Sequence, residues 1–428
     1  MPQFYETVFI GGGISCLSAA SGFRGDAILF ERADRVGGLC KSDQLAGFTF
    51  DRTGHLLHLR DPRVRRLVKR LLGDNIDELA RNSWIYSHGV YTRYPFQSHF
   101  FGLPPEVVSE CLLGMFAAHK KTNRYQPKNF AQWVMTRFGR GVARHFMFPY
   151  NQKLWTVSPR TLTTEWLGRF VPKPDLKEVI RGAVSDWHDD AGYNAKFFYP
   201  VKGGIETLVK AMTRPVKRIV CQVGVAKIDL KTRQLTLTTG DRVGFGRLVS
   251  CVALPALIKM IASKPDRISK MATKLRWSSV YNLNIGFKDR GCDRHWVYVP
   301  ENRWLPYRFG YASNFSKTMA PRGAGSLYTE TAYSRTQRLD KETARRRIIR
   351  DLIAIGVLNS KKDILVEKVH DLKYAYAIYD RNRKRSVSGL LDYLETHEIY
   401  SIGRYGRWEY SAMEDAIIQG IDLAKYKL

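Results

Sequence analysis

Short, continuous apolar runs mark two places near the N-terminus of the chain. One covers Thr7 to Ile10 and the other Ala27 to Phe30, with a glycine-rich segment and a helical pattern between them. Such runs are typical of strands buried on both faces, as in a parallel sheet covered by helices. At the other end of the chain, Met413 to Tyr426 has the spacing of an amphipathic helix. The first pattern therefore predicts a βαβ unit at the N-terminus.

The middle of the chain has two different patterns. Between residues 98 and 195, apolar positions recur with the period of a helix, as in Pro105 to His119 and Phe130 to Phe146. Between residues 276 and 390 they alternate as in strands, for example in Tyr281 to Phe287. We therefore expect a group of helices followed by an antiparallel sheet.

These patterns divide the chain into three parts. A Rossmann-like domain is discontinuous and uses residues 1-80, 200-275 and 390-428; a helical substrate-side domain, residues 98-195, is inserted into it, and an antiparallel sheet domain covers residues 276-390. At 428 residues the chain is long enough for more than one hydrophobic core. The predicted fold class is thus α/β, with a Rossmann-like domain, an inserted helical domain and an antiparallel β-sheet domain.

The cysteines and the hydropathy restrict where the protein works. Its 6 cysteines are scattered and form no CxxC pair, which argues against a disulfide framework or a zinc site. No apolar run reaches the roughly 18 residues that a membrane span needs, and the first residues lead into a strand pattern instead of a signal peptide. We therefore expect a cytoplasmic protein with reduced thiols and no bound metal.

The formal net charge of +29 is high, and basic residues cluster at 60–70, 345–350 and 381–385. The simplest interpretation is a set of solvated helix faces. The charge would also suit steering of a polyanionic substrate, or contact with an anionic membrane surface or an acidic partner. We expect no nucleic acid as partner, because no helix-turn-helix, zinc-finger or RNA-binding motif accompanies the charge.

The segment between the two N-terminal strands has a dinucleotide-binding pattern. Gly11 permits a tight turn, and Gly13 lets the backbone approach a pyrophosphate at the N-terminus of the following helix. Glu31 comes about twenty residues after the first glycine, where an acid binds a ribose 2′-hydroxyl. Cys16 replaces the third glycine, and its side chain is small enough for helix and strand to pack closely. Strand, turn, helix and acid together predict a bound dinucleotide.

Two further glycine segments indicate which dinucleotide it is. A doublet, Gly37-Gly38, follows the acid, and the segment Phe50 to His55 comes next. Near the C-terminus, Gly403-Arg404 precedes the last predicted helix. This order resembles the flavoprotein group that contains amine oxidases and protoporphyrinogen oxidase. The resemblance implies an FAD-binding domain, with the C-terminal helix returning to the cofactor and Arg404 at its pyrophosphate.

Motifs in the middle of the chain narrow the resemblance. In order, they are Tyr94-Pro95-Phe96-Gln97, Pro149-Tyr150-Asn151-Gln152-Lys153-Leu154-Trp155, Trp166-Leu167-Gly168, Phe198-Tyr199-Pro200 and Gly403-Arg404-Tyr405-Gly406-Arg407-Trp408-Glu409-Tyr410. This combination is similar to the UDP-galactopyranose mutase family, especially its eukaryotic-type branch, and spans most of the chain. That family converts UDP-galactose between its pyranose and furanose forms without net redox change. The resemblance implies that N5 of reduced FAD attacks the anomeric carbon while UDP leaves.

The resemblance also implies roles for individual residues. The cofactor would be held by Gly11, Gly13, Ile14, Ser15, Glu31, Arg32, Gly38, Leu39, Gly54, His55, Val225, Gly403, Arg404 and Met413. The nucleotide sugar would contact Gln97, Phe146, Tyr150, Asn151, Trp155, Arg169, Asn194, Trp277, Lys288, Tyr376 and Tyr410. The catalytic residues would be Gly54, His55, Arg169 and Lys288. NAD(P)H, as the reductant, would contact Arg81 and Ser83.

The chain departs from the family on the substrate side. Two arginines clamp the diphosphate in the family, whereas here Arg169 is displaced by one position and Lys288 is the nearest match to the second. Lysine keeps the charge but lacks the fork of a guanidinium. Glu414 replaces an asparagine near the diphosphate, and Trp277 replaces a tyrosine. Because the cofactor matches survive, we expect a flavin site with a different sugar nucleotide or a differently held diphosphate.

Other interpretations stay open. The leading hypothesis is a nucleotide-sugar pyranose–furanose mutase, the second is a flavin oxidoreductase of the amine oxidase or protoporphyrinogen oxidase type, and the third is a flavin-bearing binding protein without catalysis. Among the residues, Phe146, Tyr150 and Trp155 could be core aromatics, His55 a satisfied core histidine, and Arg404 half of a surface ion pair.

Overall fold

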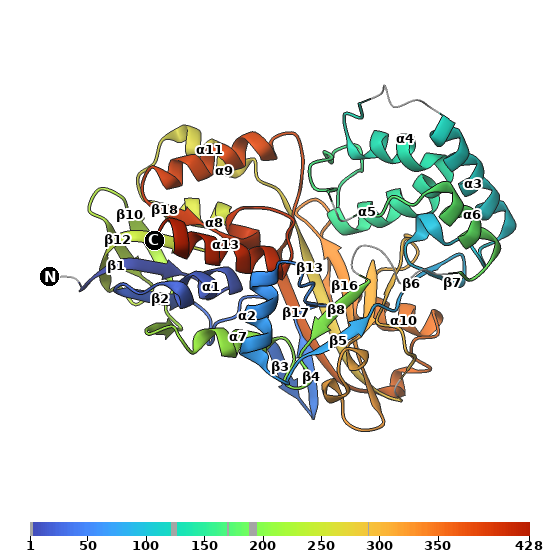
Figure 1. Cartoon of the computed structure of the whole chain (residues 1–428), viewed down its shortest axis with the longest axis horizontal. Helices are drawn as coiled ribbons and strands as arrows, with labels where there is room; N and C mark the ends of the chain where they lie inside the picture. Colours follow the sequence, from blue (N-terminus) through green and yellow to red (C-terminus); the bar gives the residue numbers. More distant parts are fainter. Residues whose placement is uncertain (1–2, 121–125, 169–170, 188–194, 290) are drawn as a thin grey trace.

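The computed structural model describes residues 3–120, 126–168, 171–187, 195–289 and 291–428. Figure 1 shows a helix-covered sheet at the left, a group of helices at the upper right and a second, longer sheet at the lower right. Segments far apart in the sequence meet in the first part, where the N-terminal helix α1 (Ile14–Gly22) packs against the C-terminal helix α13 (Met413–Tyr426).

The first part is built on a mixed sheet with a parallel centre. In spatial order its strands are β10 (Val225–Asp229), β11 (Gln234–Leu237), β12 (Arg242–Ser250), β1 (Gln3–Ile10), β2 (Ala27–Glu31) and β9 (Ile219–Cys221), with β18 (Ile399–Ser401) beside β12. β1 pairs in parallel with both β12 and β2. Phe9 and Leu29 face one core, whereas Val8 and Ile10 face another on the opposite side. This two-sided burial is the reason for the continuous apolar runs.

Helices cover both faces of this sheet. One face carries α1, α2 (Pro62–Leu72), α7 (Glu206–Thr213) and α13; the other carries α8 (Leu254–Met260), α9 (Asp266–Thr273) and α11 (Arg383–Glu395); the short α12 (Gly403–Gly406) comes between β18 and α13. The predicted C-terminal helix is confirmed by α13. Gly420 lets α13 approach α1 closely, because a Cβ there would lie 2.5 Å from the carbonyl oxygen of Ser15.

A second, mostly antiparallel sheet lies at the lower right of Figure 1. In spatial order its strands are β17 (Ile364–Ala377), β13 (Trp277–Lys288), β16 (Ala324–Tyr333), β15 (Arg308–Tyr311), β14 (Trp296–Tyr298), β6 (Ser83–Ser87) and β7 (Val90–Arg93). The alternating pattern over Tyr281 to Phe287 forms the middle of β13, and α10 (Lys341–Ala354) covers one face.

The boundaries of the three predicted parts need two corrections. The sheet predicted from residues 276–390 omits the hairpin β6–β7, which joins it through a parallel pairing of β6 with β14 and so has no local signal in the sequence. The predicted boundary at residue 390 falls inside α11, which packs against α9 on the first sheet. In the part of the chain that the structure describes, two further small sheets pair β3 (Ser42–Leu45) with β4 (Phe48–Asp51) and β5 (Asp77–Ala80) with β8 (Lys196–Tyr199).

The helical part contains α3 (Pro105–Lys120), α4 (Phe130–Val142), the π-helical turn η2 (Ala143–Met147), α5 (Phe148–Trp155) and α6 (Leu176–Val184). The helix predicted over Phe130 to Phe146 is not continuous, because Gly139 has a φ of +74° and kinks the chain where it meets Gly114 of α3. Single 3-10 turns occur at η1 (Phe96–Ser98), η3 (Ala312–Asn314), η4 (Lys317–Met319) and η5 (Lys361–Asp363).

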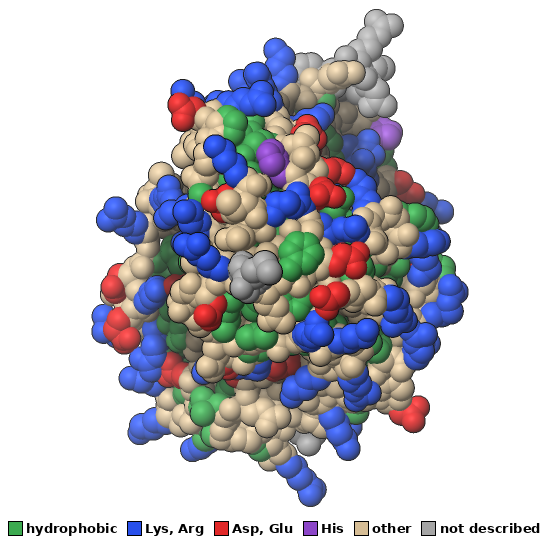
Figure 2. Space-filling view, turned by 90° about the vertical axis from the view of Figure 1, so that its left-hand side faces the viewer, with side chains coloured by type: hydrophobic (Ala, Val, Ile, Leu, Met, Phe, Trp, Pro, Cys, Tyr) green, Lys and Arg blue, Asp and Glu red, His purple; other side chains and the backbone are tan. Residues whose placement is uncertain are grey.

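Lys and Arg side chains are spread over the face seen in Figure 2, with Asp and Glu between them. Several of the clustered arginines are paired, such as Arg345 with Glu367 at 2.6 Å and Arg350 with Asp351 at 3.2 Å. Within the described ranges, no helix combines the length and the apolar character that a membrane crossing needs. The same ranges contain no group of three or more His, Cys, Asp or Glu side chains that could hold a metal ion.

Candidate functional site

The turn between β1 and α1 folds tightly against the loop after β2. Gly11 has a φ of +90°, which a residue with a Cβ rarely adopts. The amide of Gly37 donates to the carbonyl of Gly12 at 2.7 Å, and a side chain at Gly12 would strike Val36. Glycine is therefore required for the backbone of both segments to meet here.

Cys16 occupies the position of the third glycine and is completely buried. Its thiol lies 3.8 Å from the carbonyl oxygens of Ile10 and Val249, between β1 and β12, and burial raises its pKa. The expectation that a small thiol permits close packing is confirmed. A second thiol that the sequence analysis missed, Cys251, lies against the turn, where its sulfur accepts the amide of Gly13 at 3.3 Å.

The N-terminus of α1 is open to an anion. Its first turn contains no acidic residue, and its cap, Gly13, has no side chain. In the described part of the chain the amides of Ile14 and Ser15 have no acceptor. A Cβ at Gly38 would lie 3.5 Å from the Cα of Gly13, and one at Gly403 would strike Ser15. Free amides at a helix N-terminus, enclosed by glycines, suit the pyrophosphate of a dinucleotide.

Glu31, Arg32 and Val225 lie together beside this turn. The carboxylate of Glu31 accepts the amide of Gly12 at 2.6 Å and keeps lone pairs for a ribose hydroxyl. Arg32 lies against Gly224, immediately before Val225 at the start of β10. The structure thus brings these predicted cofactor residues to one edge of the sheet, and their contacts with a cofactor stay a prediction.

Leu39 and Met413 extend the site away from the glycine turn. Met413, the first residue of α13, touches Cys40 with 3.5 Å between the sulfur atoms. Leu39 packs against the core of the helical part. The segment after Gly38 therefore leads from the glycine turn toward the helices.

Gly54 and His55 lie against the second sheet. A Cβ at Gly54 would be 2.5 Å from the hydroxyl oxygen of Tyr328 on β16. Burial lowers the pKa of His55 to about 4, while the charge of Glu330 acts in the opposite direction, so the ring is neutral near pH 7. The buried Nδ1 has no side-chain partner among the described residues, and the backbone of Thr53 is the polar group that acts on the ring. The interpretation of His55 as a satisfied core histidine therefore stays open.

Arg404 is a half-buried cation among aromatic rings. Its guanidinium carbon lies 5.0 Å from the ring centres of both Tyr376 and Tyr410. It donates to the carbonyls of Ser411 at 2.6 Å and Ala375 at 3.1 Å. Because no carboxylate of the described residues forms an ion pair with it, the surface ion pair considered for Arg404 is wrong. A guanidinium enclosed without a counter-charge is a place for an anion. The sequence predicts Arg404 at the pyrophosphate of FAD, whereas its guanidinium lies between the two tyrosines predicted for the substrate.

Arg308, which no motif in the sequence indicates, faces the same tyrosine cluster, formed by Tyr376 and Tyr410. It begins β15 and donates to both carboxylate oxygens of Glu330 on β16, at 3.0 and 2.7 Å. Burial raises the pKa of Tyr410, and the charges of Arg404 and Arg308 both act to lower it. An arginine and a glutamate placed opposite each other on neighbouring strands are the signal that could have revealed this pair, but only once the register was known.

Two predicted substrate residues lie elsewhere. Lys288 is the exposed last residue of β13, so its assignment to the diphosphate is wrong, and Arg308 is the guanidinium that reaches the tyrosines. Trp277 begins the same strand and packs against Trp408, in the core on the face of the first sheet that α8, α9 and α11 cover. Its assignment to the substrate is therefore wrong as well. The two ends of this 12-residue strand are about 36 Å apart and cannot share one ligand.

Aromatic rings continue from the cluster into the helical part. Phe146 and Tyr150 stack with their centres 5.2 Å apart, and Tyr150 meets Tyr298 of β14 edge-on at 5.4 Å. Trp155 has no exposed surface and packs against Tyr410 at 5.7 Å. Phe146 is also buried, because its ring is stacked between Phe96 and Tyr150. Phe146 and Trp155 are therefore core aromatics, as one interpretation of the sequence expects, and Tyr150 is the ring that meets Tyr298.

The two predicted substrate amides already have partners in the protein. Asn151 donates to the carbonyl of Met147 at 2.8 Å and accepts the indole N–H of Trp155 at 3.2 Å. Gln97 donates to the carbonyl of Pro172 at 2.8 Å. Each amide keeps a second N–H that a ligand could accept.

Arg81 and Ser83 lie at the edge of the second sheet. Ser83 is buried at the start of β6. The guanidinium of Arg81 lies 5.2 Å from the ring centre of Tyr94, which stacks on Tyr298 at 4.8 Å. The predicted reductant residues are thus connected through rings to the tyrosine cluster. The predicted Arg169 and Asn194 lie outside the described residues.

Glu414 turns away from the tyrosines. It is 4% exposed, and its carboxylate accepts the amides of Arg60 and, at 2.7 Å, of Asp61, just before α2. The carboxylate predicted near the diphosphate therefore holds the start of another helix instead.

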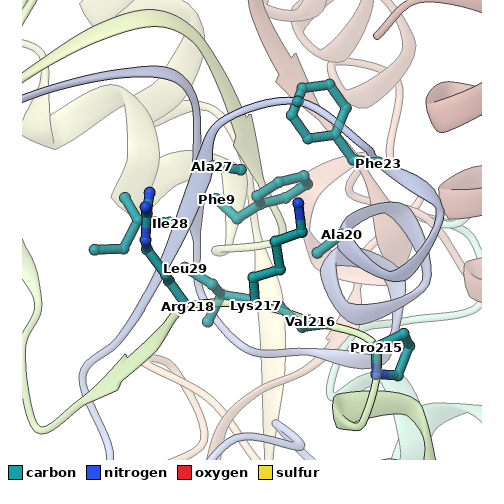
Figure 3. A pocket seen from close by; sticks show the side chains of 11 residues that line it. Phe9, Ala20, Phe23, Ala27, Ile28, Leu29, Pro215, Val216, Lys217 and Arg218 are labelled. Carbon is teal, nitrogen blue, oxygen red and sulfur yellow. The ribbon is translucent and has the colours of Figure 1, made fainter.

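A small hollow beside β1 and β2 is separate from this site. Figure 3 shows Phe9, Phe23 and Leu29 around it, together with Lys217 from the segment before β9. Its volume of about 20 Å³ has room for one water molecule at most, so it cannot hold a nucleotide.

Comparisons with known proteins agree with this geometry. The model of the family described as flavin containing amine oxidoreductase matches residues 15–426. The crystal structure of a reduced UDP-galactopyranose mutase is 27% identical, with a TM-score of 0.93 over 99% of this chain and 95% of that one. A putrescine oxidase bound to putrescine is 17% identical, with a TM-score of 0.64 over 99% of each chain, a likeness of fold alone. The predicted α/β fold class is confirmed by these matches.

Proposed function

We propose that this chain, which belongs to the flavin-containing amine oxidoreductase family, is an FAD-dependent mutase that interconverts the pyranose and furanose forms of a nucleotide sugar. The observation that carries this proposal is Arg404, held between Tyr376 and Tyr410 without a carboxylate partner in the described ranges. Such a cation suits a diphosphate. An amine substrate, being cationic, would be repelled by it. The likeness to a UDP-galactopyranose mutase supports the same choice.

FAD fits the residues that are present. Its pyrophosphate would take the free amides at Ile14 and Ser15, and Glu31 would accept a ribose hydroxyl. The backbone at Gly54 and His55 would lie at the flavin ring. In its reduced form the cofactor would supply, at N5, the nucleophile for the anomeric carbon.

The protein's own contribution would be to bind the diphosphate and to stabilise the charge left on it when the sugar departs. Arg404 and Arg308 would do this electrostatically, inside an aromatic surround that keeps water away. Burial raises the pKa of Tyr376 and of Tyr410, so both hydroxyls stay protonated and can donate hydrogen bonds to phosphate oxygens. Arg169, beyond the described residues, is proposed as a further cation, and Asn194 as a further polar contact.

Neutral His55 does not serve as an acid near pH 7, since burial lowers its pKa to about 4. Its proposed contribution is through the backbone that it shares with Gly54. Tyr150, held in place by the buried ring of Phe146, would provide an aromatic contact for the uracil or the sugar. NAD(P)H is the proposed reductant, with Arg81 and Ser83 as its contacts.

UDP-galactose is the first substrate that we propose. The reason to expect another sugar nucleotide was the loss of a clamping arginine and the gain of a carboxylate. Arg308 supplies a guanidinium where Lys288 does not, and Glu414 is turned to the amide of Asp61. With these contacts, neither reason favours another sugar nucleotide over UDP-galactose.

The test is anaerobic turnover with the FAD-loaded protein. Dithionite-reduced and oxidised enzyme would each be offered UDP-galactose, then GDP- and dTDP-sugars, and furanose products sought by chromatography and NMR. We expect product only from the reduced enzyme and no hydrogen peroxide. Flavin bleaching by an amine or another substrate, with peroxide released in air, would contradict the mutase and favour an oxidoreductase.

The reductant is tested separately. NADPH and NADH would be mixed anaerobically with oxidised enzyme, and the loss of flavin absorbance followed in the wild type and in Arg81→Ala. We expect the variant to be reduced more slowly by the nicotinamide and equally fast by dithionite. Equal rates with the nicotinamide would remove Arg81 from this role.

A further inference from the structure

Lys153 lies one turn after Tyr150 on α5 and forms no ion pair with any described residue. Its Nζ points into the connection between β14 and β15, residues 299–307, called here the 299–307 loop. It donates to four carbonyl oxygens of this loop, those of Val299 at 2.8 Å, Glu301 at 3.1 Å, Trp304 at 2.8 Å and Pro306 at 2.7 Å.

The positive charge explains why four carbonyls can converge on one point. Their dipoles repel one another, and each oxygen would be left without a partner if an apolar group occupied the centre. An ammonium has three N–H donors, so it serves three carbonyls directly and the fourth by sharing. The shape of the 299–307 loop therefore depends on the donors of Lys153 and not on its volume.

The 299–307 loop begins and ends at residues of the site. Tyr298 precedes it, and Arg308 follows Tyr307 at its end. The amide of Val299 donates to the carbonyl of Tyr307 at 2.8 Å, which closes the loop. The rings of Tyr298 and Tyr307 both contact the ring of Tyr150, with their centres 5.4 and 6.1 Å away. Helix α5 therefore contacts the middle of the loop through Lys153 and both ends of the loop through Tyr150.

We propose that Lys153 is a positioning residue for the diphosphate site, because its ammonium fixes the 299–307 loop against α5 and thereby sets the place of Arg308. This inference rests on the proposed function, in which a diphosphate is the ligand of Arg308.

The surroundings of Lys153 act on its charge in opposite directions. Burial lowers its pKa to about 7, and the charges of Asp351 and Glu301 act in the opposite direction, while Arg347 lowers it further. The carbonyl oxygens also favour the charged form, since they accept hydrogen bonds from it. Asp351 accepts the amide of Leu305 at 2.7 Å, so α10 holds the other side of the loop.

The experiment compares three variants of the full-length, FAD-loaded protein. Lys153→Met keeps the length of the side chain and removes all donors, Lys153→Gln keeps two donors, and Lys177→Met changes an exposed lysine on α6 as a control. Amide hydrogen exchange of the 299–307 loop and the affinity for UDP would be measured on each. For Lys153→Met we expect faster exchange in the loop and about tenfold weaker UDP binding. Lys153→Gln should fall between it and the wild type, with FAD content and Lys177→Met unchanged.

Loop exchange that stays at the wild-type rate in Lys153→Met would overturn the proposal. So would faster loop exchange with unchanged UDP affinity, because the loop would then not control Arg308. If neither Lys153 variant folds with FAD, the residue serves the whole fold and the assignment to this loop is wrong. Wild-type protein that binds UDP but does not turn over UDP-galactose would contradict the mutase alone, and the comparison of loop exchange and UDP affinity would still decide the role of Lys153.

Discussion

Replacing Glu330 with glutamine removes the counter-charge of Arg308 without changing the size of the side chain. Glu330 is 1% exposed and accepts two hydrogen bonds from Arg308, at 3.0 and 2.7 Å. Breaking a buried pair at one partner costs about 3–5 kcal/mol, because the other charge stays behind. Here the guanidinium side chain is 21% exposed and glutamine keeps one acceptor, so we expect the free energy of unfolding to fall by about 2–3 kcal/mol.

Urea unfolding of the FAD-loaded protein at pH 7 measures this loss. Circular dichroism and flavin fluorescence would be followed together, since their transitions must coincide for the free energies of the variants to be compared. The control is the double variant Arg308→Met/Glu330→Gln, which buries no unpaired charge and should be more stable than Glu330→Gln alone. UDP should stabilise Glu330→Gln more than it stabilises the wild type, because the released guanidinium can bind a diphosphate.

Two results would refute this reasoning. A loss below about 0.5 kcal/mol is what a surface substitution gives, and it would mean that water reaches the pair freely. A single variant as stable as the double one would mean that the guanidinium left without its carboxylate carries no cost.

Three further predictions concern the cofactor, a helix start and acid stability. Gly403→Ala should weaken FAD binding in a titration of apoprotein, because φ is +77° and the new Cβ meets the start of α1; Gly323→Ala has the same strain but meets nothing, and should bind as the wild type does. Glu414→Gln should lower the free energy of unfolding by about 1–3 kcal/mol, since the charged acceptor of the Asp61 amide is lost, and urea unfolding at pH 7 would show no change if this contact is unimportant. The pKa of His55 is lowered to about 4, below its unfolded value of about 6.5, so between these pH values the unfolded chain binds more protons and stability falls as the pH falls. His55→Asn should lose less stability than the wild type between pH 7 and pH 5; equal losses in urea would contradict the lowered pKa.

The elements that the sequence predicted well are those whose signal is local. The apolar runs of β1 and β2 must be continuous because both faces of these strands are buried, and the glycines between them are required by a positive φ and a close backbone approach. The sequence of α13 is likewise amphipathic because one face of the helix is buried. Cys16 could be accepted as a glycine substitute because only its size matters at that contact.

The site was predicted less well because its charges are brought together by strand register and helix packing. Lys288 is the basic residue nearest the expected position in the sequence, yet the register of β15 on β16 places Arg308 opposite Glu330 and next to the tyrosines. The sequence predicts that Glu414 adds a charge near the diphosphate, but its side chain on α13 reaches the start of α2 instead.

By itself, the sequence determined that this is an α/β flavoprotein fold with a dinucleotide turn, since turns, buried strands and helix faces each depend on residues that are close together in the chain. Only the tertiary structure decided which charges share the site. Strand register, and the direction in which a helix presents a side chain, are set by packing between segments that are not neighbours in the sequence. A spacing in the sequence cannot encode the distance between Arg404, from the last part of the chain, and Arg308, from the second sheet.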